Sequence, residues 1–246
     1  MKLTQIAVTC ALAATATFSQ AKPLWQDFSV TALYGENYKS PYATGNEKIE
    51  QTTFTAEYAA GFKYGDVFFF ADRARAEGDV KSTYFELAPR ISLGGISGKD
   101  LSFGPIKDVL IATTWEANSQ DFSNFDNYLY GLGFSLKIPY TNYANINFYK
   151  VENENTKDDY QMTITYAVPF KIGSEEFLAD AFLDWSTAES DHKSELNWTS
   201  QYKWNAGKHI SPDTKLYIGV EHSVWNNKFG SNIRQNDVSA LVKYHF

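Results

Sequence analysis

The sequence predicts an all-β fold, an antiparallel transmembrane β-barrel of about 12 strands that follows a cleaved signal peptide. Three observations lead to this fold class. Segments in which polar and apolar residues alternate recur along the chain, aromatic residues make up 16% of it, and no apolar run approaches the ~18 residues of a transmembrane helix. In a barrel every second residue faces water, so the mean hydropathy stays at −0.38.

The N-terminus has the three parts of a secretory signal peptide. Lys2 is the positive region, residues 6–18 are apolar and uncharged, and a Ser-Gln-Ala sequence forms the cleavage site. The apolar stretch is too short to span a bilayer. We therefore expect a signal peptide at residues 1–21 and the barrel at 22–246. The chain has one cysteine, Cys10, within the signal, so the mature barrel has no thiol chemistry.

The first half of the barrel follows from alternation with a period of two. Each of these segments has an apolar face and a polar face, and they are expected at residues 28–34, 53–62, 66–72, 84–93, 109–115 and 128–137. The charged stretch 73–82 is expected to be a loop. The sixth segment is the clearest of these, because large apolar residues alternate with Gly, Ser and Lys.

The second half repeats the pattern. Its segments alternate in the same way, and they are expected at residues 144–149, 160–168, 177–185, 195–204, 216–225 and 238–246. The last strand should pair with the first, which leaves no open edge. Strand lengths near ~9–11 residues, an even count and short turns that alternate with longer polar loops are typical of transmembrane barrels. A soluble β-sandwich also has alternating strands, but its core could not hold so many large aromatic residues.

The inward face is expected to carry the function. In the third segment Asp66, Phe68, Phe70 and Asp72 point inward, although porin interiors are mostly polar. Aromatic rings can stack on nucleobases, at roughly 1–3 kcal/mol per base, and a carboxylate accepts hydrogen bonds from a ribose or an amine. The alternative is that the two rings pack against each other and fill the lumen.

Other strands add inward-facing aromatic and ionisable residues. Glu86 and Arg90 lie four residues apart on one face, where they form either a substrate contact or a structural ion pair across the lumen. The predicted lumen-binding set is Phe68, Phe70, Asp72, Tyr84, Glu86, Arg90, Tyr149, Asp180, Phe182, Asp184, Tyr217 and Trp225.

Several motifs resemble the Tsx-type family of nucleoside-specific outer-membrane channels. They are F-F-F-A-D at 68–72, Y-F-E-L-A-P-R-I-S from Tyr84, D-L-S-F-G-P-I-K-D from Asp100 and F-L-D-W at 182–185. The resemblance implies a monomeric barrel in the outer membrane of a Gram-negative bacterium that passes nucleosides or similar small solutes by diffusion. It also implies a role as a phage or colicin receptor.

The chain departs from this family in two places. Phe68 and Phe70 stand where Tyr is common, which removes hydroxyl contacts, and the segment 152–158 is short and polar. The terminal aromatic-x-Phe ending at Phe246 resembles the assembly signal of outer-membrane barrels. It implies contact with the barrel-assembly machinery, and the membrane placement implies contact with the lipid bilayer and lipopolysaccharide.

Other functional classes lack their residues. A net charge of −7 argues against nucleic-acid binding. His222 and Ser223 are adjacent, so on a strand they point to opposite faces and cannot form the Ser–His pair of an outer-membrane hydrolase. No metal-ligand spacing occurs. We therefore expect neither enzyme activity, a catalytic residue, a metal nor a cofactor.

Overall fold

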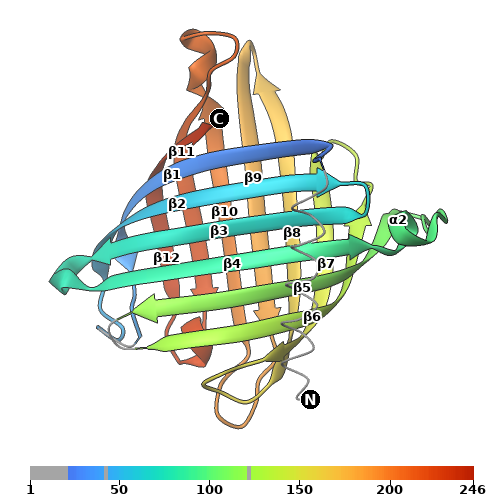
Figure 1. Ribbon diagram of the computed structural model, residues 1–246. Helices are drawn as coiled ribbons and strands as arrows, with labels where there is room; N and C mark the ends of the chain where they lie inside the picture. Colours follow the sequence, from blue (N-terminus) through green and yellow to red (C-terminus); the bar gives the residue numbers. More distant parts are fainter. Residues whose placement is uncertain (1–21, 42–43, 121–122) are drawn as a thin grey trace.

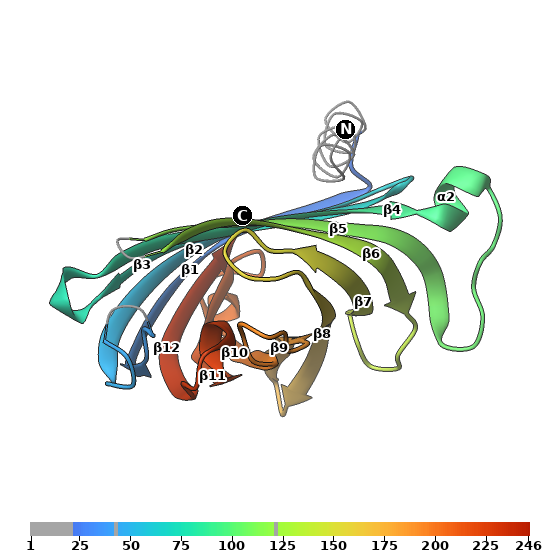
Figure 2. The ribbon, with the colours of Figure 1, turned by 90° about the horizontal axis from the view of Figure 1, so that it is seen from below.

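A computed structural model describes residues 22–41, 44–120 and 123–246 of the chain, so the expected signal peptide lies outside the described residues. The described residues form twelve antiparallel strands, each paired with its neighbour in the chain, and β1 pairs with β12 to close the barrel. The predicted fold class is confirmed. In Figure 1 the strands β1–β6 cross in front of β8–β12, and Figure 2 shows these groups as facing walls.

The strands are longer than the alternation predicted. Their bounds are β1 (Trp25–Tyr38), β2 (Ile49–Phe62), β3 (Gly65–Ala76), β4 (Lys81–Ser92), β5 (Ile106–Gln120), β6 (Asn124–Leu136), β7 (Tyr143–Glu152), β8 (Asp159–Ile172), β9 (Glu175–Ser186), β10 (Glu195–Asn205), β11 (Lys215–Asn226) and β12 (Gln235–His245). The short helical segments are η1 (Glu77–Asp79), α2 (Leu93–Ser97), η2 (Ala206–His209) and η3 (Lys228–Gly230). No described helix has the length and apolar character needed to cross a membrane.

The expected loop at 73–82 is mostly strand. β3 continues to Ala76 and β4 begins at Lys81, with Arg73 paired with Thr83 and Arg75 paired with Lys81. Charge does not end a strand here because the arginine side chains project away from the barrel interior and stay exposed. Only the residues of η1 and Val80 connect the two strands.

Closure of the barrel depends on the last strand, as predicted. β12 pairs with β1 from Ser29 opposite His245 to Tyr34 opposite Ala240. Beyond the strand, the Phe246 amide donates to the Phe28 carbonyl at 2.9 Å, and the two rings lie 5.3 Å apart. Toward the other end of the seam, the Asn37 and Lys39 amides donate to the side chains of Asp237 and Gln235, so side chains continue the closure where the backbone ladder ends.

Alternate residues face opposite sides of this single wall. In β12, Asp237 and Ser239 are 1% and 0% exposed, whereas Val238 and Val242 are 54% and 47% exposed. Polar side chains thus line the inside, and apolar side chains cover the outside. Because directly paired residues share a face of a sheet, the strand register extends this assignment around the barrel.

The connections differ from the strict alternation that was expected. β1 begins and β12 ends at the same end of the barrel, termed the terminal end. It carries two-residue turns at 63–64 and 173–174, but also the longer connections 93–105 and 206–214. The connection 93–105 contains α2, which Figure 1 shows at the end of β4. Since the tightest turns belong to the periplasmic side of such barrels, we assign the opposite, far end to the cell exterior.

Candidate functional site

Four inward rings form an aromatic ladder in the lumen. Ring centroids are 5.9 Å apart between Phe68 and Phe70, 5.7 Å between Phe70 and Tyr84, and 6.3 Å between Tyr84 and Phe125. The ladder runs from β3 through β4 to β6. Its rings are tilted to one another, so they form a series of contacts along the wall.

Phe125 is the ladder residue that sequence reasoning missed. It precedes the segment predicted as the sixth strand, whereas β6 begins at Asn124. Continuing the alternation backward from Leu129 would have placed Phe125 on the inward face. Its neighbour across the sheet, Asn118, is also the partner of Tyr84, which brings the two rings to either side of one residue.

Carboxylates surround the ladder and form an acidic layer, defined as Asp72, Glu86, Glu116 and Asp184. Glu86 lies directly opposite Glu116 in the register, and Asp72 lies beside it on the adjacent strand β3, while Asp184 belongs to β9 on the facing wall. Like charges placed directly opposite are destabilising. Among the described ion pairs, none includes a carboxylate of this layer.

Neutral hydrogen-bond donors hold the acidic layer in place. The Tyr84 hydroxyl donates to Glu86 at 2.7 Å, Thr55 donates to Asp72 at 2.5 Å, and Thr163 donates to Asp184 at 2.5 Å. Each carboxylate keeps further acceptor capacity. No cluster of three or more His, Cys, Asp or Glu side chains in the described chain could hold a metal ion. The layer therefore offers acceptors to a solute that carries donors.

Three inward cations belong to a separate set of ion pairs. Arg90 donates two hydrogen bonds to Asp66, at 2.8 and 2.7 Å, Lys203 pairs with Asp180 at 2.5 Å, and Lys243 pairs with Glu57. Lys203 is only 1% exposed. These cations are already neutralised, so they offer little to an anionic solute.

The expected alternative of an ion pair between Glu86 and Arg90 is wrong. Arg90 lies directly opposite Asp66 in the register, whereas four residues along a strand separate it from Glu86 by about 13 Å. Arg90 also donates to Asn145 at 3.2 Å and to Asn147 at 3.4 Å, on β7. The Arg90 side chain on β4 thus connects β3 to β7.

Small residues make room for this bridge. Ala112 on β5 and Gly131 on β6 share the register row of Arg90. A Cβ atom at Gly133 would lie 2.5 Å from the Asn147 side-chain oxygen, so a larger residue would displace it. The buried Tyr149 lies in the same region and accepts from Thr114 at 3.5 Å.

The remaining predicted residues do not join the ladder. Phe182 lies on the inward face of β9, opposite Thr199 and Thr165. Tyr217 contacts His245 with centroids 5.5 Å apart near the terminal end. Trp225 lies at the far end, where it donates to Glu195 and contacts Phe229 at 4.8 Å.

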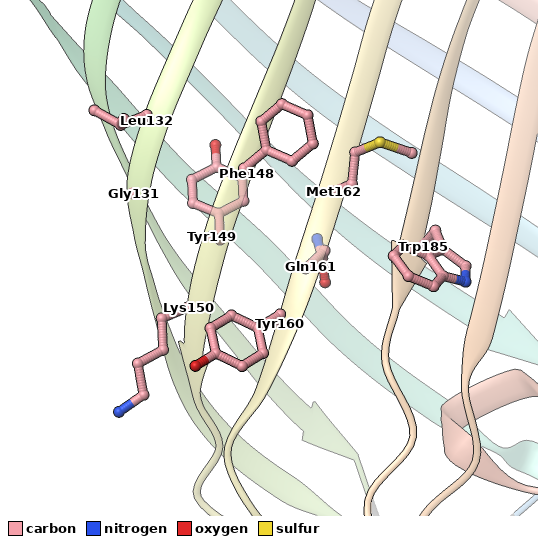
Figure 3. A pocket seen from close by; sticks show the side chains of 9 residues that line it. All are labelled: Gly131, Leu132, Phe148, Tyr149, Lys150, Tyr160, Gln161, Met162 and Trp185. Atoms are coloured by element: carbon pink, nitrogen blue, oxygen red, sulfur yellow. The ribbon is translucent and has the colours of Figure 1, made fainter.

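A groove of about 370 Å³ lies on the outside of the barrel and is separate from the lumen. Figure 3 shows Phe148, Met162 and Trp185 on neighbouring strands along it. Phe148 and Trp185 are 47% and 41% exposed on the apolar face. Lys150 lies one row nearer the far end, beside Tyr160. The groove is therefore part of the lipid-facing surface.

Comparison with known proteins identifies the family of this chain. The family model described as "Nucleoside-specific channel-forming protein, Tsx" matches residues 25–246. The chain is 26% identical over 181 residues to outer membrane protein OmpK of Vibrio parahaemolyticus, covering 71% of this chain and 68% of the relative. It is 25% identical over 260 residues to the nucleoside-specific channel-forming protein Tsx of Klebsiella aerogenes, covering 92% and 85%.

Among solved structures, the KdgM porin aligns with 89% of this chain and 99% of its own, with a TM-score of 0.48 and 11% identity. The family match spans the whole barrel and agrees with its inward polar and outward apolar faces. The chain belongs to the Tsx family of nucleoside-specific channel-forming proteins and is a channel for small solutes in the Gram-negative outer membrane.

Proposed function

We propose that this channel passes nucleosides by diffusion and binds them weakly on the way. The base stacks on the aromatic ladder, and the acidic layer accepts hydrogen bonds from the sugar or the base edge. The observation that carries the proposal is the contact of Phe70 with Tyr84, whose hydroxyl donates to Glu86. A ring face and a carboxylate thus meet at one place in the lumen.

The chemistry of the lumen favours a neutral or cationic solute with an aromatic ring. Stacking on each ring contributes roughly 1–3 kcal/mol and does not depend on base identity. Carboxylates accept from hydroxyl and amine groups. Binding must remain weak, since a channel has to release its solute.

The predicted site residues take different parts in this proposal. Phe68, Phe70, Tyr84 and Phe182 would contact the base. Asp72, Glu86 and Asp184 would accept hydrogen bonds, while Arg90, Tyr149, Asp180, Tyr217 and Trp225 would shape the lumen through the contacts described above. Phe125 and Glu116 join the set on structural grounds, because they contact Tyr84 and face Glu86.

We also propose that the chain acts only as a channel and not as a hydrolase. The His222 Nε2 atom lies 2.9 Å from the Asn236 amide oxygen, while Ser223 accepts from Thr199 at 3.2 Å on the opposite, inward face. The two side chains therefore cannot share a proton. Export by the signal peptide, insertion by the barrel-assembly machinery, a monomeric state and use as a phage or bacteriocin receptor remain predictions from the sequence.

Liposome swelling tests the nucleoside proposal. Liposomes that contain the channel should swell faster in nucleosides than in sugars of similar size. The Phe68→Ala, Phe70→Ala double variant should lose this difference while it still passes the sugars. Equal rates for nucleosides and sugars in the unaltered channel would refute selectivity, and unchanged selectivity in the variant would exclude these two rings.

A further inference from the structure

Three cations lie on the outward face of β3 and β4 at the far end of the barrel. We call Arg73, Arg75 and Lys81 the basic rim. Arg73 lies between Phe54 and Thr83 in the register, and Arg75 lies directly opposite Lys81. All three share the parity of the lipid-facing residues of their strands, so they do not line the lumen.

The basic rim is only partly neutralised. Arg73 and Arg75 are exposed, and Arg73 donates to the neutral Thr83 hydroxyl at 2.7 Å. Lys81 pairs with Asp79 at 2.8 Å. The hydrogen bond from Lys81, together with the charge of Arg75, lowers the pKa of the Asp79 carboxyl. The same turn contains Glu77, so its two carboxylates stand against three cations.

The register places like charges side by side in this rim. Arg75 directly opposite Lys81 is an unfavourable cross-strand pair, which Asp79 offsets in part by its ion pair with Lys81, while Arg73 and Arg75 have no ion pair among those of the described residues. A phosphate can bind both, since the arginine fork matches its oxygens. The charge of the basic rim therefore complements an anion that approaches the barrel wall from outside.

Directly below the rim the outward face is apolar and aromatic. Phe69 and Phe85 have centroids 6.3 Å apart, and Phe85 and Trp115 lie edge to face at 4.9 Å. These rings are closer to the middle of the wall than the cations. Cations at the edge of an apolar band complement a molecule with phosphates at one end and acyl chains at the other.

We propose that the basic rim binds the phosphate groups of a phosphorylated glycolipid of the outer leaflet, of the lipid A type, whose acyl chains lie on the aromatic band below. The far end of the barrel faces the cell exterior, where this leaflet lies. The lipid would hold β3 and β4 from outside, on the strands whose inward faces carry most of the aromatic ladder.

The chain offers a matched control at Lys150. It is also a cation on the outward face near the far end, but it pairs with Asp158 at 3.5 Å and has no second cation opposite it. Its register partners are Tyr130 and Tyr160. If outward cations attract anionic lipid only in a general way, removing the charge of Lys150 and removing the charges of the basic rim should weaken lipid binding equally. A phosphate site at the basic rim predicts a loss only when the rim is changed.

Binding of lipid A to the purified full-length channel tests this proposal. In detergent micelles, native mass spectrometry would compare bisphosphorylated lipid A with its dephosphorylated form. The Arg73→Gln, Arg75→Gln variant should bind the phosphorylated lipid about 30-fold more weakly, and Lys150→Gln should bind it as the unaltered channel does. The dephosphorylated lipid should bind weakly to all three.

Equal affinity in the double variant would overturn the proposal, and so would an equal loss in Lys150→Gln or equal binding of the dephosphorylated lipid. Folding is checked by the shift in gel mobility on heating. If the Arg73→Gln, Arg75→Gln variant does not fold, the proposal is tested with the Arg73→Lys, Arg75→Lys variant instead. It is also tested by the salt dependence of lipid A affinity in the unaltered channel. A phosphate site requires affinity that falls with added salt, and affinity independent of salt would refute it.

Discussion

Neighbouring phenylalanines in β3 have opposite surroundings. Phe70 faces the lumen and contacts Phe68 and Tyr84, whereas Phe69 faces outward and contacts Phe85. Phe70→Ala should weaken nucleoside binding by roughly 1–3 kcal/mol, because one stacking face is lost. Titration of the purified channel with a nucleoside, followed by the quenching of tryptophan fluorescence, would measure this.

Phe69→Ala is the matched control for that change. It removes the same ring from the outer surface of the same strand, so nucleoside affinity should stay within about twofold of the unaltered channel, since the lumen keeps every ring. A similar loss in both variants would mean that the effect comes from the stability of β3 and not from stacking.

Arg90 shows how the choice of partner depends on the register. Asp66 and Glu86 both lie on its face, and spacing along β4 allowed either an ion pair of Arg90 with Glu86 or a substrate contact. The cross-strand neighbour forms the pair instead, with two hydrogen bonds. Glu86 is consequently left without a cation in the described structure and can take part in solute binding.

The connection 227–234 between β11 and β12 is packed onto the strands at the far end. Lys228 donates to the Gln235 side chain at 2.6 Å, and its ammonium lies 4.6 Å from the Trp225 ring. The Gly230 amide donates to Glu195 at 2.9 Å. Burial lowers the pKa of Lys228 to about 7, although the charges of Glu195 and Asp237 oppose this shift.

Docking of this connection should therefore depend on pH. An undocked Lys228 regains its ordinary pKa of 10.5, so the undocked state holds more protons between pH 7 and 10.5. Docking should strengthen as pH rises through this window, by up to about 1.4 kcal/mol per pH unit, and should not change further below pH 7. A nitroxide attached to Arg234→Cys should become less mobile between pH 7 and 9.5.

Lys228→Met is the control for the pH effect. Methionine fills the buried space without a titrating group, so the nitroxide mobility should lose its dependence on pH. The expected absence of cysteine from the mature chain makes the label unique to the introduced residue. An unchanged pH response in Lys228→Met would assign the effect to another titrating group.

The arrangement of charge over the whole lumen predicts ion selectivity. The acidic layer has no ion-paired member in the described residues, while Arg90, Lys203 and Lys243, three cations of the inward face, are each paired with a carboxylate. A low-dielectric wall strengthens the field of such a layer. In planar bilayers with a KCl gradient, the reversal potential should show that K⁺ passes more readily than Cl⁻.

Substitution of the two facing carboxyl groups tests which residues set this selectivity. The Glu86→Gln, Glu116→Gln variant should move the K⁺/Cl⁻ permeability ratio toward one. Glu152→Gln is the control, because Glu152 lies on the outward face and accepts from Tyr130 at 3.1 Å. Loss of selectivity in Glu152→Gln to the same degree would show that surface charge, and not the lumen, determines the ratio.

The sequence by itself determined the fold class, the number of strands and the face of each predicted lumen residue. This was possible because polar and apolar residues alternate within each strand, and that alternation identifies its inward and outward faces. It also indicated the closing pair of β1 and β12. It did not determine the strand ends, since Arg73 and Arg75 extend β3 by projecting outward.

Only the tertiary structure decided which inward residues meet. The contact of Phe125 with Tyr84, the choice of Asp66 by Arg90 and the facing carboxylates Glu86 and Glu116 all depend on the register between strands and on closure of the barrel. A shift of two residues would keep every face and change every neighbour. The period-two pattern cannot distinguish such registers, because it repeats after the same two residues.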